Sequence, residues 1–265
     1  MELFLYVFIL AVLVLASWQF FQARAFRARA LSLAARLREG PQAAALTGLP
    51  AEVLCYASRA GAEPGLGLRV AALGLEGEMR VNGVLRRFEA WQVMALGRAG
   101  FLFDASRSFG PWPPDRVVET LIAGDGRVEE RRLVSLPLAR RKGRETALAA
   151  AYRYLADLPW APDAMIGNPA LHWRSQAEGA VLVSLETPAG EARAGYLFNA
   201  EGDVVSMAAA GVPDGAGGQC DWKASYSDYA QVGQRCVPQR IEVRTAGPDG
   251  GVLRRASLRN MQLSI

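Results

Sequence analysis

The hydrophobic pattern of the chain begins with an unbroken apolar run, LFLYVFILAVLVLASWQFF, at residues 3–21. As a helix with a rise of about 1.5 Å per residue, this run spans about 28 Å, close to the ~30 Å hydrocarbon core of a bilayer. Signal peptides usually start with basic residues and end at a small-residue cleavage site, but Glu2 is the only charged residue before this run. We therefore expect an uncleaved transmembrane anchor at residues 1–23, with a buried core helix as the alternative.

The pattern after the anchor remains helical. Residues 24–39 are rich in Ala, Leu and Arg and contain neither Gly nor Pro, which predicts a helix that ends at Gly40–Pro41. Arginines around this helix are typical of a solvated stalk, and contact with anionic lipid headgroups is the alternative. We assign residues 24–48 to a helical stalk and linker. A short helix with Pro in its first turn is expected at residues 50–58.

From Leu66 onward, apolar and polar residues alternate, and turn signals such as Asn82–Gly83 recur along the chain. This pattern predicts a mainly antiparallel sheet of hairpin-connected strands. Strands are expected at residues 66–81, 84–95, 101–107, 116–122, 128–136, 180–186, 192–198, 204–209, 238–245 and 252–263. Residues 211–218 are glycine-rich and predict a flexible loop.

One helical segment interrupts the strands. Residues 146–158, TALAAAYRYLADL, contain good helix formers and no helix breaker, and Pro159 and Pro162 end the segment. Its apolar face consists of Leu148, Ala151, Tyr152 and Leu155. A helix between two blocks of strands predicts an α+β fold, with a central helix packed on a curved, half-barrel-like sheet. Residues 49–265 are expected to form this single domain.

The composition limits the classes of partner and cofactor that we expect. A chain of 265 residues with 51% hydrophobic residues can bury a true core. The net charge is +4, and the densest basic run, between residues 127 and 144, has no interleaved aromatics, so no nucleic-acid partner is expected. We interpret this run as a solvated loop and helix start, with anionic headgroups as the alternative contact. A single His and no CxxC pair predict no metal site, and no cofactor is expected.

The three cysteines exclude a disulfide-dense scaffold. Cys55 is expected on the apolar face of the short helix. Cys220 and Cys236 flank fifteen residues and could form a disulfide worth roughly 3 kcal/mol if their segments face each other; free thiols are the alternative. Such a disulfide suits an oxidising compartment, whereas the arginines after the anchor favour the cytoplasmic side. The side of the membrane therefore stays open.

Short motifs follow one another in a fixed order after the anchor. They are Leu49–Pro50 with Tyr56, Gly77–Glu78–Met79–Arg80, Phe88 with Ala90 and Gln92, Phe101–Ala105, Asp115, Gly124–Asp125–Gly126, and later Trp222, Tyr229, Gly233 and Pro238. The central signature is Arg153–Tyr154–Leu155 with Asp157, then Trp160, Pro162 and Trp173. Over roughly residues 49–263 this order resembles a family of bacterial membrane-anchored proteins known only as a domain of unknown function.

The chain departs from this family at three points. Phe103 stands in place of a Trp, Asp157 in place of the usual Glu, and Ala208–Ala210 in place of an Arg–Tyr pair, so any role of that pair is in doubt here. The resemblance implies no activity, and it implies a single-pass protein of the bacterial inner (cytoplasmic) membrane. The strand–helix–strand order is similar to the half-barrel of bacterial lipoprotein carriers, which by fold analogy implies an apolar ligand.

Few residues suggest catalysis. His172 is the only imidazole, and a general base would need an orienting partner beside it. Asp104 and Asp115 could form an acid–base pair at a suitable distance, with ordinary surface acids as the alternative. Arg153 and Asp157 are spaced i, i+4 in the order less favourable for an exposed pair. We therefore expect this pair to tie the helix to the sheet or to the Trp160 turn, with a ligand-gripping Arg153 as the alternative.

Aromatic residues provide the leading hypothesis. A curved sheet crossed by a helix encloses an aromatic-lined space that is either core or a binding groove. The expected groove residues are Trp91, Phe103, Tyr154, Trp160, Trp173 and Trp222. We hypothesise a non-catalytic, membrane-anchored domain that binds an apolar or lipidic ligand, or a membrane partner of unknown identity. The alternatives are a hydrolase-type enzyme that uses His172 or acids of the sheet, and a structural subunit of a membrane complex.

Overall fold

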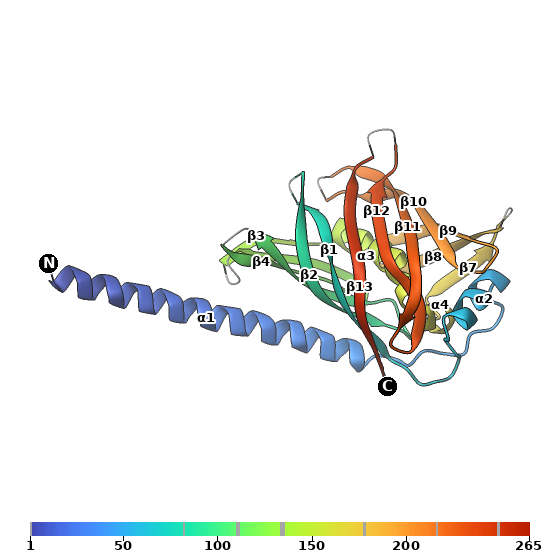
Figure 1. Ribbon diagram of the computed structural model, residues 1–265, viewed down its shortest axis with the longest axis horizontal. Coiled ribbons are helices and arrows are strands. Elements are labelled where there is room, and N and C mark those ends of the chain that lie inside the picture. The colour runs from blue at the N-terminus through green and yellow to red at the C-terminus, as the bar shows by residue number, and fades with distance from the viewer. Residues whose placement is uncertain are drawn as a thin grey trace.

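A single antiparallel sheet dominates the computed structural model, which describes residues 2–81, 83–109, 112–132, 136–176, 179–215, 217–247 and 250–265 (Figure 1). The helices are α1 (Glu2–Arg38), α2 (Ala51–Arg59), α3 (Arg144–Asp157), the 3-10 turn η1 (Leu158–Trp160) and α4 (Pro162–Gly167). The strands are β1 (Val70–Val81), β2 (Val84–Ala95), β3 (Phe101–Phe109), β4 (Trp112–Ile122), β5 (Asp125–Arg132), β6 (Leu136–Lys142), β7 (Leu171–Ser175), β8 (Ala180–Thr187), β9 (Gly190–Phe198), β10 (Val204–Pro213), β11 (Gln219–Val232), β12 (Arg235–Thr245) and β13 (Val252–Ser264).

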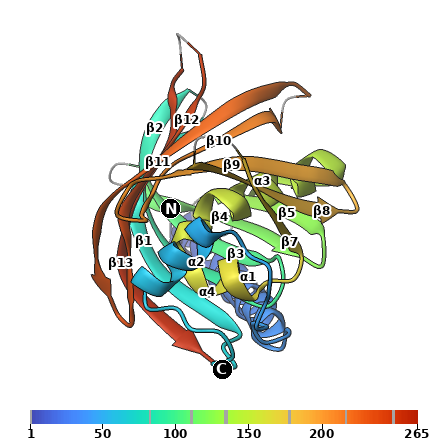
Figure 2. The same cartoon turned by 90° about the vertical axis from the view of Figure 1, so that its right-hand side faces the viewer.

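The sheet consists of two meanders, β1–β6 and β7–β13. They are joined where the first strand of the chain pairs with the last. Its thirteen described strands lie in the order β6-β5-β4-β3-β2-β1-β13-β12-β11-β10-β9-β8-β7. The antiparallel pair β1–β13 connects the block before α3 with the block after it. Figure 2 shows the sheet curled around α2, α3 and α4. The expected α+β half-barrel with a central helix is therefore confirmed.

Two strands are missing from those expected from the sequence. β6 lies in the basic run interpreted as a loop, and β11 occupies the segment between the two cysteines. β6 is almost entirely exposed, so it lacks the apolar alternation that marks a half-buried strand. The expected glycine-rich loop is shorter than 211–218, because β10 extends to Pro213.

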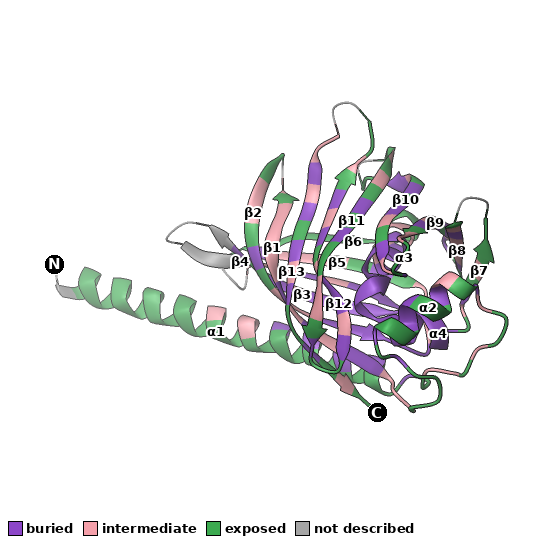
Figure 3. Cartoon of the chain, turned by 45° about the vertical axis from the view of Figure 1, so that its right-hand side comes forward, coloured by how far each residue is buried: buried purple, intermediate pink, exposed green. Residues whose placement is uncertain are grey.

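The two faces of the sheet bury different partners, as alternation of side chains along each strand requires. The concave face packs against α2, α3 and α4 and holds the larger core, which includes Trp160, Tyr154 and Phe103. A second cluster lies on the convex face, where α1 contributes Phe26, Ala30, Ala34 and Leu37. Figure 3 shows α1 exposed at its beginning, with buried positions only along the part that lies against the sheet.

Helix α1 runs without a break from the apolar segment onto the sheet. Among the described residues it is the one helix long and apolar enough to cross a membrane, and its apolar part is exposed. Residues 24–38, expected as a solvated stalk or a headgroup contact, are helical, and four of them are buried on the convex face. The direction of α1 relative to the sheet is thus set by packing. The division of the chain into an anchor, a stalk and a domain, with boundaries at residues 23 and 48, stays a prediction.

Close packing of α3 on β5 makes a specific prediction for Gly126. A Cβ at this position would lie 2.3 Å from the Cα of Ala147 in α3, whereas a Cβ at Gly195 in β9 would meet nothing within 4 Å. Gly126→Ala is expected to lower the free energy of unfolding by about 1–3 kcal/mol through overpacking. Gly195→Ala, the matched control, is expected to leave it unchanged or raise it by about 0.5–1 kcal/mol.

Both variants can be measured by denaturant unfolding of the full-length protein in detergent, followed by tryptophan fluorescence. Equal stability of the two variants would show that α3 does not pack on β5 as closely as the structure has it.

Candidate functional site

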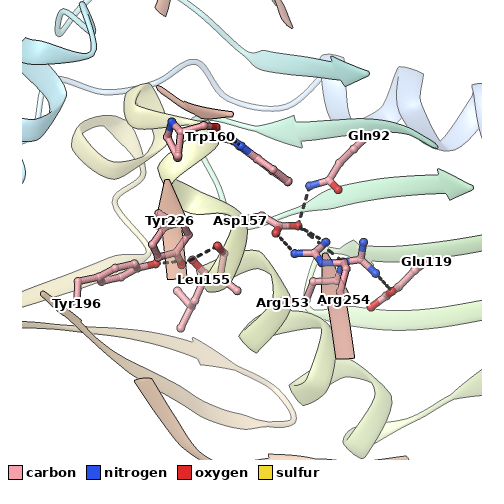
Figure 4. Close-up of polar contacts among 11 residues, drawn as sticks. Gln92, Glu119, Arg153, Leu155, Asp157, Trp160, Tyr196, Tyr226 and Arg254 are labelled. Atoms are coloured by element: carbon pink, nitrogen blue, oxygen red, sulfur yellow. Dashed lines mark hydrogen bonds and ion pairs between the residues drawn. The ribbon is translucent and has the colours of Figure 1, made fainter. Parts of the chain in front are cut away.

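An ionic cluster fixes the C-terminal half of α3 on the concave face (Figure 4). The Asp157 carboxylate is buried, with 1% of its side chain exposed, and it accepts hydrogen bonds from both terminal nitrogens of Arg254 on β13. Gln92 Nε2 on β2 also donates to Asp157, at 3.0 Å. Burial alone would lower the pKa of Arg254, but Asp157 raises it above its ordinary value. Arg254 therefore stays charged and holds α3 to the middle of the sheet.

Arg153 lies one turn before Asp157 and is less completely paired. Its Nη1 donates to Glu119 on β4, and its guanidinium carbon lies 3.9 Å from the ring centre of Phe103 on β3. Its Nε lies 3.7 Å from Asp157, outside hydrogen-bond distance. Nε and Nη2 are buried without a hydrogen-bond partner. Burial lowers the pKa of Arg153 from its ordinary value, and Glu119, the largest opposing charge, does not fully offset this effect.

Aromatic donors satisfy the carbonyl groups at the end of α3 and in η1. Tyr196 donates to Leu155 O, Tyr226 to Ala156 O at 2.9 Å, and Tyr56 to Pro159 O at 2.6 Å. Burial raises the pKa of all three hydroxyls, so they remain protonated donors. Because the last carbonyls of a helix lack partners within it, these bonds replace a conventional cap.

A cavity of about 380 Å³ opens beside the N-terminal half of α3. Its apolar walls are Met79, Val81, Phe103, Val117, Val128, Ala149, Pro213, Trp222, Val243 and Leu253. Thr146 and Gly215 also line it, together with five arginines and four carboxylates: Arg80, Arg107, Arg141, Arg153, Arg254, Glu119, Glu130, Glu145 and Asp214. Trp222 Nε1 is buried without a hydrogen-bond partner. The cavity is therefore amphipathic and falls within the size range of small-molecule sites.

The six expected groove residues do not lie together. Phe103 and Trp222 line the cavity. Tyr154 and Trp160 are fully buried in the core, and Trp160 Nε1 donates to Pro238 O at 2.8 Å. Trp173 packs against Tyr196, with ring centres 5.9 Å apart.

Trp91 lies on the other side of the sheet. It packs beside the cluster that α1 forms on the convex face, and Arg38 of α1 lies 5.9 Å from its ring centre. Two of the six expected residues thus reach the cavity, three lie in or against the core, and Trp91 packs beside α1.

The candidate catalytic residues lie outside the cavity. His172 is exposed on β7, opposite Ser184 of β8. Asp104 pairs with Arg116 at 2.7 and 2.5 Å on the convex side, whereas Asp115 lies opposite Arg107 in the register of β3 and β4. Successive residues of a strand face opposite sides, so Asp104 and Asp115 point away from each other. Within the described residues, no group of three His, Cys, Asp or Glu side chains could hold a metal.

Of the two states that the sequence left open for Cys220 and Cys236, the structure has the free thiols. Cys220 begins β11, while Cys236 lies opposite Gln231 near the other end of that strand. Eleven residues of extended chain separate these positions by roughly 35 Å, and a disulfide joins Cα atoms about 5–6 Å apart. Cys55, expected on an apolar helix face, is exposed on α2.

Sequence reasoning identified Arg153 and Asp157 but missed the functional roles of their partners Glu119 and Arg254, and it noted Gln92 only as part of a motif. One signal was present: Arg254 occupies an inward position in the alternation Val252, Arg254, Ala256, Leu258. An inward charge on a strand requires a buried counter-charge. The partner itself lies 97 residues away and could not be chosen from the pattern.

Comparisons with known proteins give a family and a likeness of fold. The profile of a family of unknown function, DUF6544, matches residues 39–252. No curated protein matches the chain in sequence. A LolA superfamily protein from Nitrosomonas europaea is similar in structure, with 9% identity and a TM-score of 0.42, over 81% of this chain and 92% of that one. A DUF1329 family protein from Desulfovibrio piger is similar with 8% identity and a TM-score of 0.45, over 81% and 91%.

Proposed function

The chain belongs to the family of unknown function DUF6544, and we propose that it is a membrane-anchored binding protein that holds a lipid-like ligand on the concave face of its sheet. The family resemblance expected from the motifs is thereby confirmed. The observation that carries the proposal is the amphipathic cavity between α3 and the sheet, in which ten apolar residues meet a charged lining. Ligand sites are typically concave and apolar, with a few placed polar groups.

The scaffold around the cavity supports binding by a preformed site. The Asp157 cluster and the aromatic donors hold α3 at both its side and its end. Because these groups are buried, α3 cannot shift without breaking charged hydrogen bonds. A site on rigid elements holds its ligand at a low cost in ordering.

We further propose that α1 is retained as the anchor. Its apolar half is continuous with the half that packs on the convex face through Ala30, Ala34 and Leu37. A rigid helix of this kind would keep the domain, and with it the cavity, in a constant orientation to the bilayer. Proximity to the bilayer fits a ligand taken from lipid.

Binding fits these observations better than hydrolysis does. His172, Asp104 and Asp115 lie outside the cavity. Two of the glutamates in the cavity lining, Glu119 and Glu130, are each paired with arginine.

The proposal is tested by filling the cavity. Ala149 on α3 lines it, and Ala149→Trp would place an indole in the space that the ligand needs. We expect native mass spectrometry of the full-length protein, purified in detergent, to find a retained lipid-like molecule on the wild type. Its occupancy is expected to fall about tenfold or more in Ala149→Trp, a loss of about 1.4 kcal/mol or more.

Ala200→Trp is the matched control, since Ala200 is exposed in the turn between β9 and β10. Lipid bound around α1 would be present on all three proteins alike, so only the difference between the two variants reports on the cavity. Equal occupancy in Ala149→Trp and Ala200→Trp would refute binding at this site.

A further inference from the structure

Three buried hydrogen-bond donor atoms without acceptors belong to two side chains that line the same cavity. They are the Nε–Nη2 edge of Arg153 and the indole Nε1 of Trp222. Donors in protein interiors almost always have an acceptor, and leaving one unpaired costs about 1–3 kcal/mol, more for a charged group. Each such group therefore needs an explanation, and here both come from one site.

The unpaired edge of Arg153 has a specific shape. Nη1 is occupied by Glu119, so the remaining edge is the two-nitrogen fork of Nε and Nη2. This fork matches the two oxygens of a carboxylate or phosphate group, which it binds by parallel hydrogen bonds. The Phe103 ring beneath the guanidinium fixes its plane.

The register places Trp222 near the same charges. Ala224 of β11 pairs with Val243 of β12, and Val243 pairs with Arg254 of β13. Trp222 is the next inward residue of β11 beyond Ala224, so it lies on the same face of the sheet as Arg254 and lines the cavity with it. The cavity also has apolar walls, with Val128, Val117 and Leu253 among them.

From this arrangement we propose that the cavity recognises an acidic amphiphile, with its anionic oxygens on Arg153 and Trp222 and its hydrocarbon along the apolar walls. This inference rests on the proposed function and specifies the headgroup of its ligand. The carboxylate of a fatty acid and the phosphate of a phosphorylated lipid share this chemistry.

The experiment uses three probes with the same twelve-carbon chain: dodecanoate, dodecyl phosphate and dodecanol. Each is followed by NMR of its head atom, ¹³C or ³¹P, while it is titrated onto the full-length protein in detergent. We expect at least one acidic probe to bind the wild type about tenfold more tightly than dodecanol, as a charge-assisted pair of hydrogen bonds requires. The tighter of the two acidic probes identifies the source of the headgroup.

Trp222→Phe is the decisive variant, because it removes an N–H group without a partner and keeps an aromatic ring. It is expected to weaken binding of the acidic probe about threefold to tenfold, without weakening dodecanol and without lowering stability. Trp91→Phe on the convex face is the matched control and should change neither. The double variant Arg153→Gln with Glu119→Gln removes the fork while it leaves no buried charge unpaired, and it should abolish the preference for an acid.

The outcomes separate this inference from the proposed function. Saturable binding of all three probes with equal affinity, unchanged in Trp222→Phe, would overturn the acidic headgroup and leave the lipid-binding cavity standing. A wild-type protein that binds no probe saturably would overturn both.

Discussion

Replacing Asp157 by alanine is expected to lower the free energy of unfolding by about 3–5 kcal/mol, because the change leaves the Arg254 guanidinium buried without its counter-charge. Asp157 accepts hydrogen bonds from Arg254 and Gln92 of the sheet, and its carboxylate also lies 3.7 Å from Arg153 Nε of α3 without a hydrogen bond to it. The measurement is denaturant unfolding of the full-length protein in detergent.

Two further variants distinguish the loss of the buried ion pair from a general effect of substitution on stability. Asp157→Ala combined with Arg254→Met removes both charges and is expected to recover most of the loss, since replacing a buried pair by apolar residues is often neutral. Glu191→Ala breaks an exposed pair with Arg193 and should change stability little. A single Asp157→Ala variant as stable as Glu191→Ala would mean that water reaches this cluster.

Trp160→Ala is expected to have the second large effect, lowering the free energy of unfolding by about 3–5 kcal/mol. Trp160 is fully buried in the turn after α3, and its Nε1 donates to Pro238 O at 2.8 Å. Alanine would leave a cavity the size of an indole and an unpaired carbonyl group on β12. Thermal unfolding of the full-length protein would show the loss as a lowered midpoint.

Trp160→Phe distinguishes the two contributions. It retains most of the volume and removes only the donor, so a smaller loss of about 1–3 kcal/mol is expected. Trp18→Ala in the exposed apolar part of α1 is the control, and it should leave the unfolding of the domain unchanged. A Trp160→Ala variant of wild-type stability would show that Trp160 lines an empty groove after all, as the sequence alone had allowed.

The sequence by itself determined the features that depend on local periodicity. An apolar run predicted the apolar half of α1, helical spacing bounded by Pro159 predicted α3, and alternation predicted most of the strands. These features are readable because each is encoded by neighbours along the chain, within the period of a helix or a strand. The family signature around Arg153, Asp157 and Trp160 was readable for the same reason.

Only the tertiary structure decided which of these residues meet. Gln92, Glu119 and Arg254 converge on α3 because β1 pairs with β13, a contact that joins opposite ends of the sequence. The face of each residue was decided by register, which placed Trp91 against α1 and Trp222 in the cavity. Register also set Cys220 and Cys236 at opposite ends of a hairpin. Strand pairing depends on how the whole sheet buries its apolar face, so it cannot be predicted from a local sequence pattern.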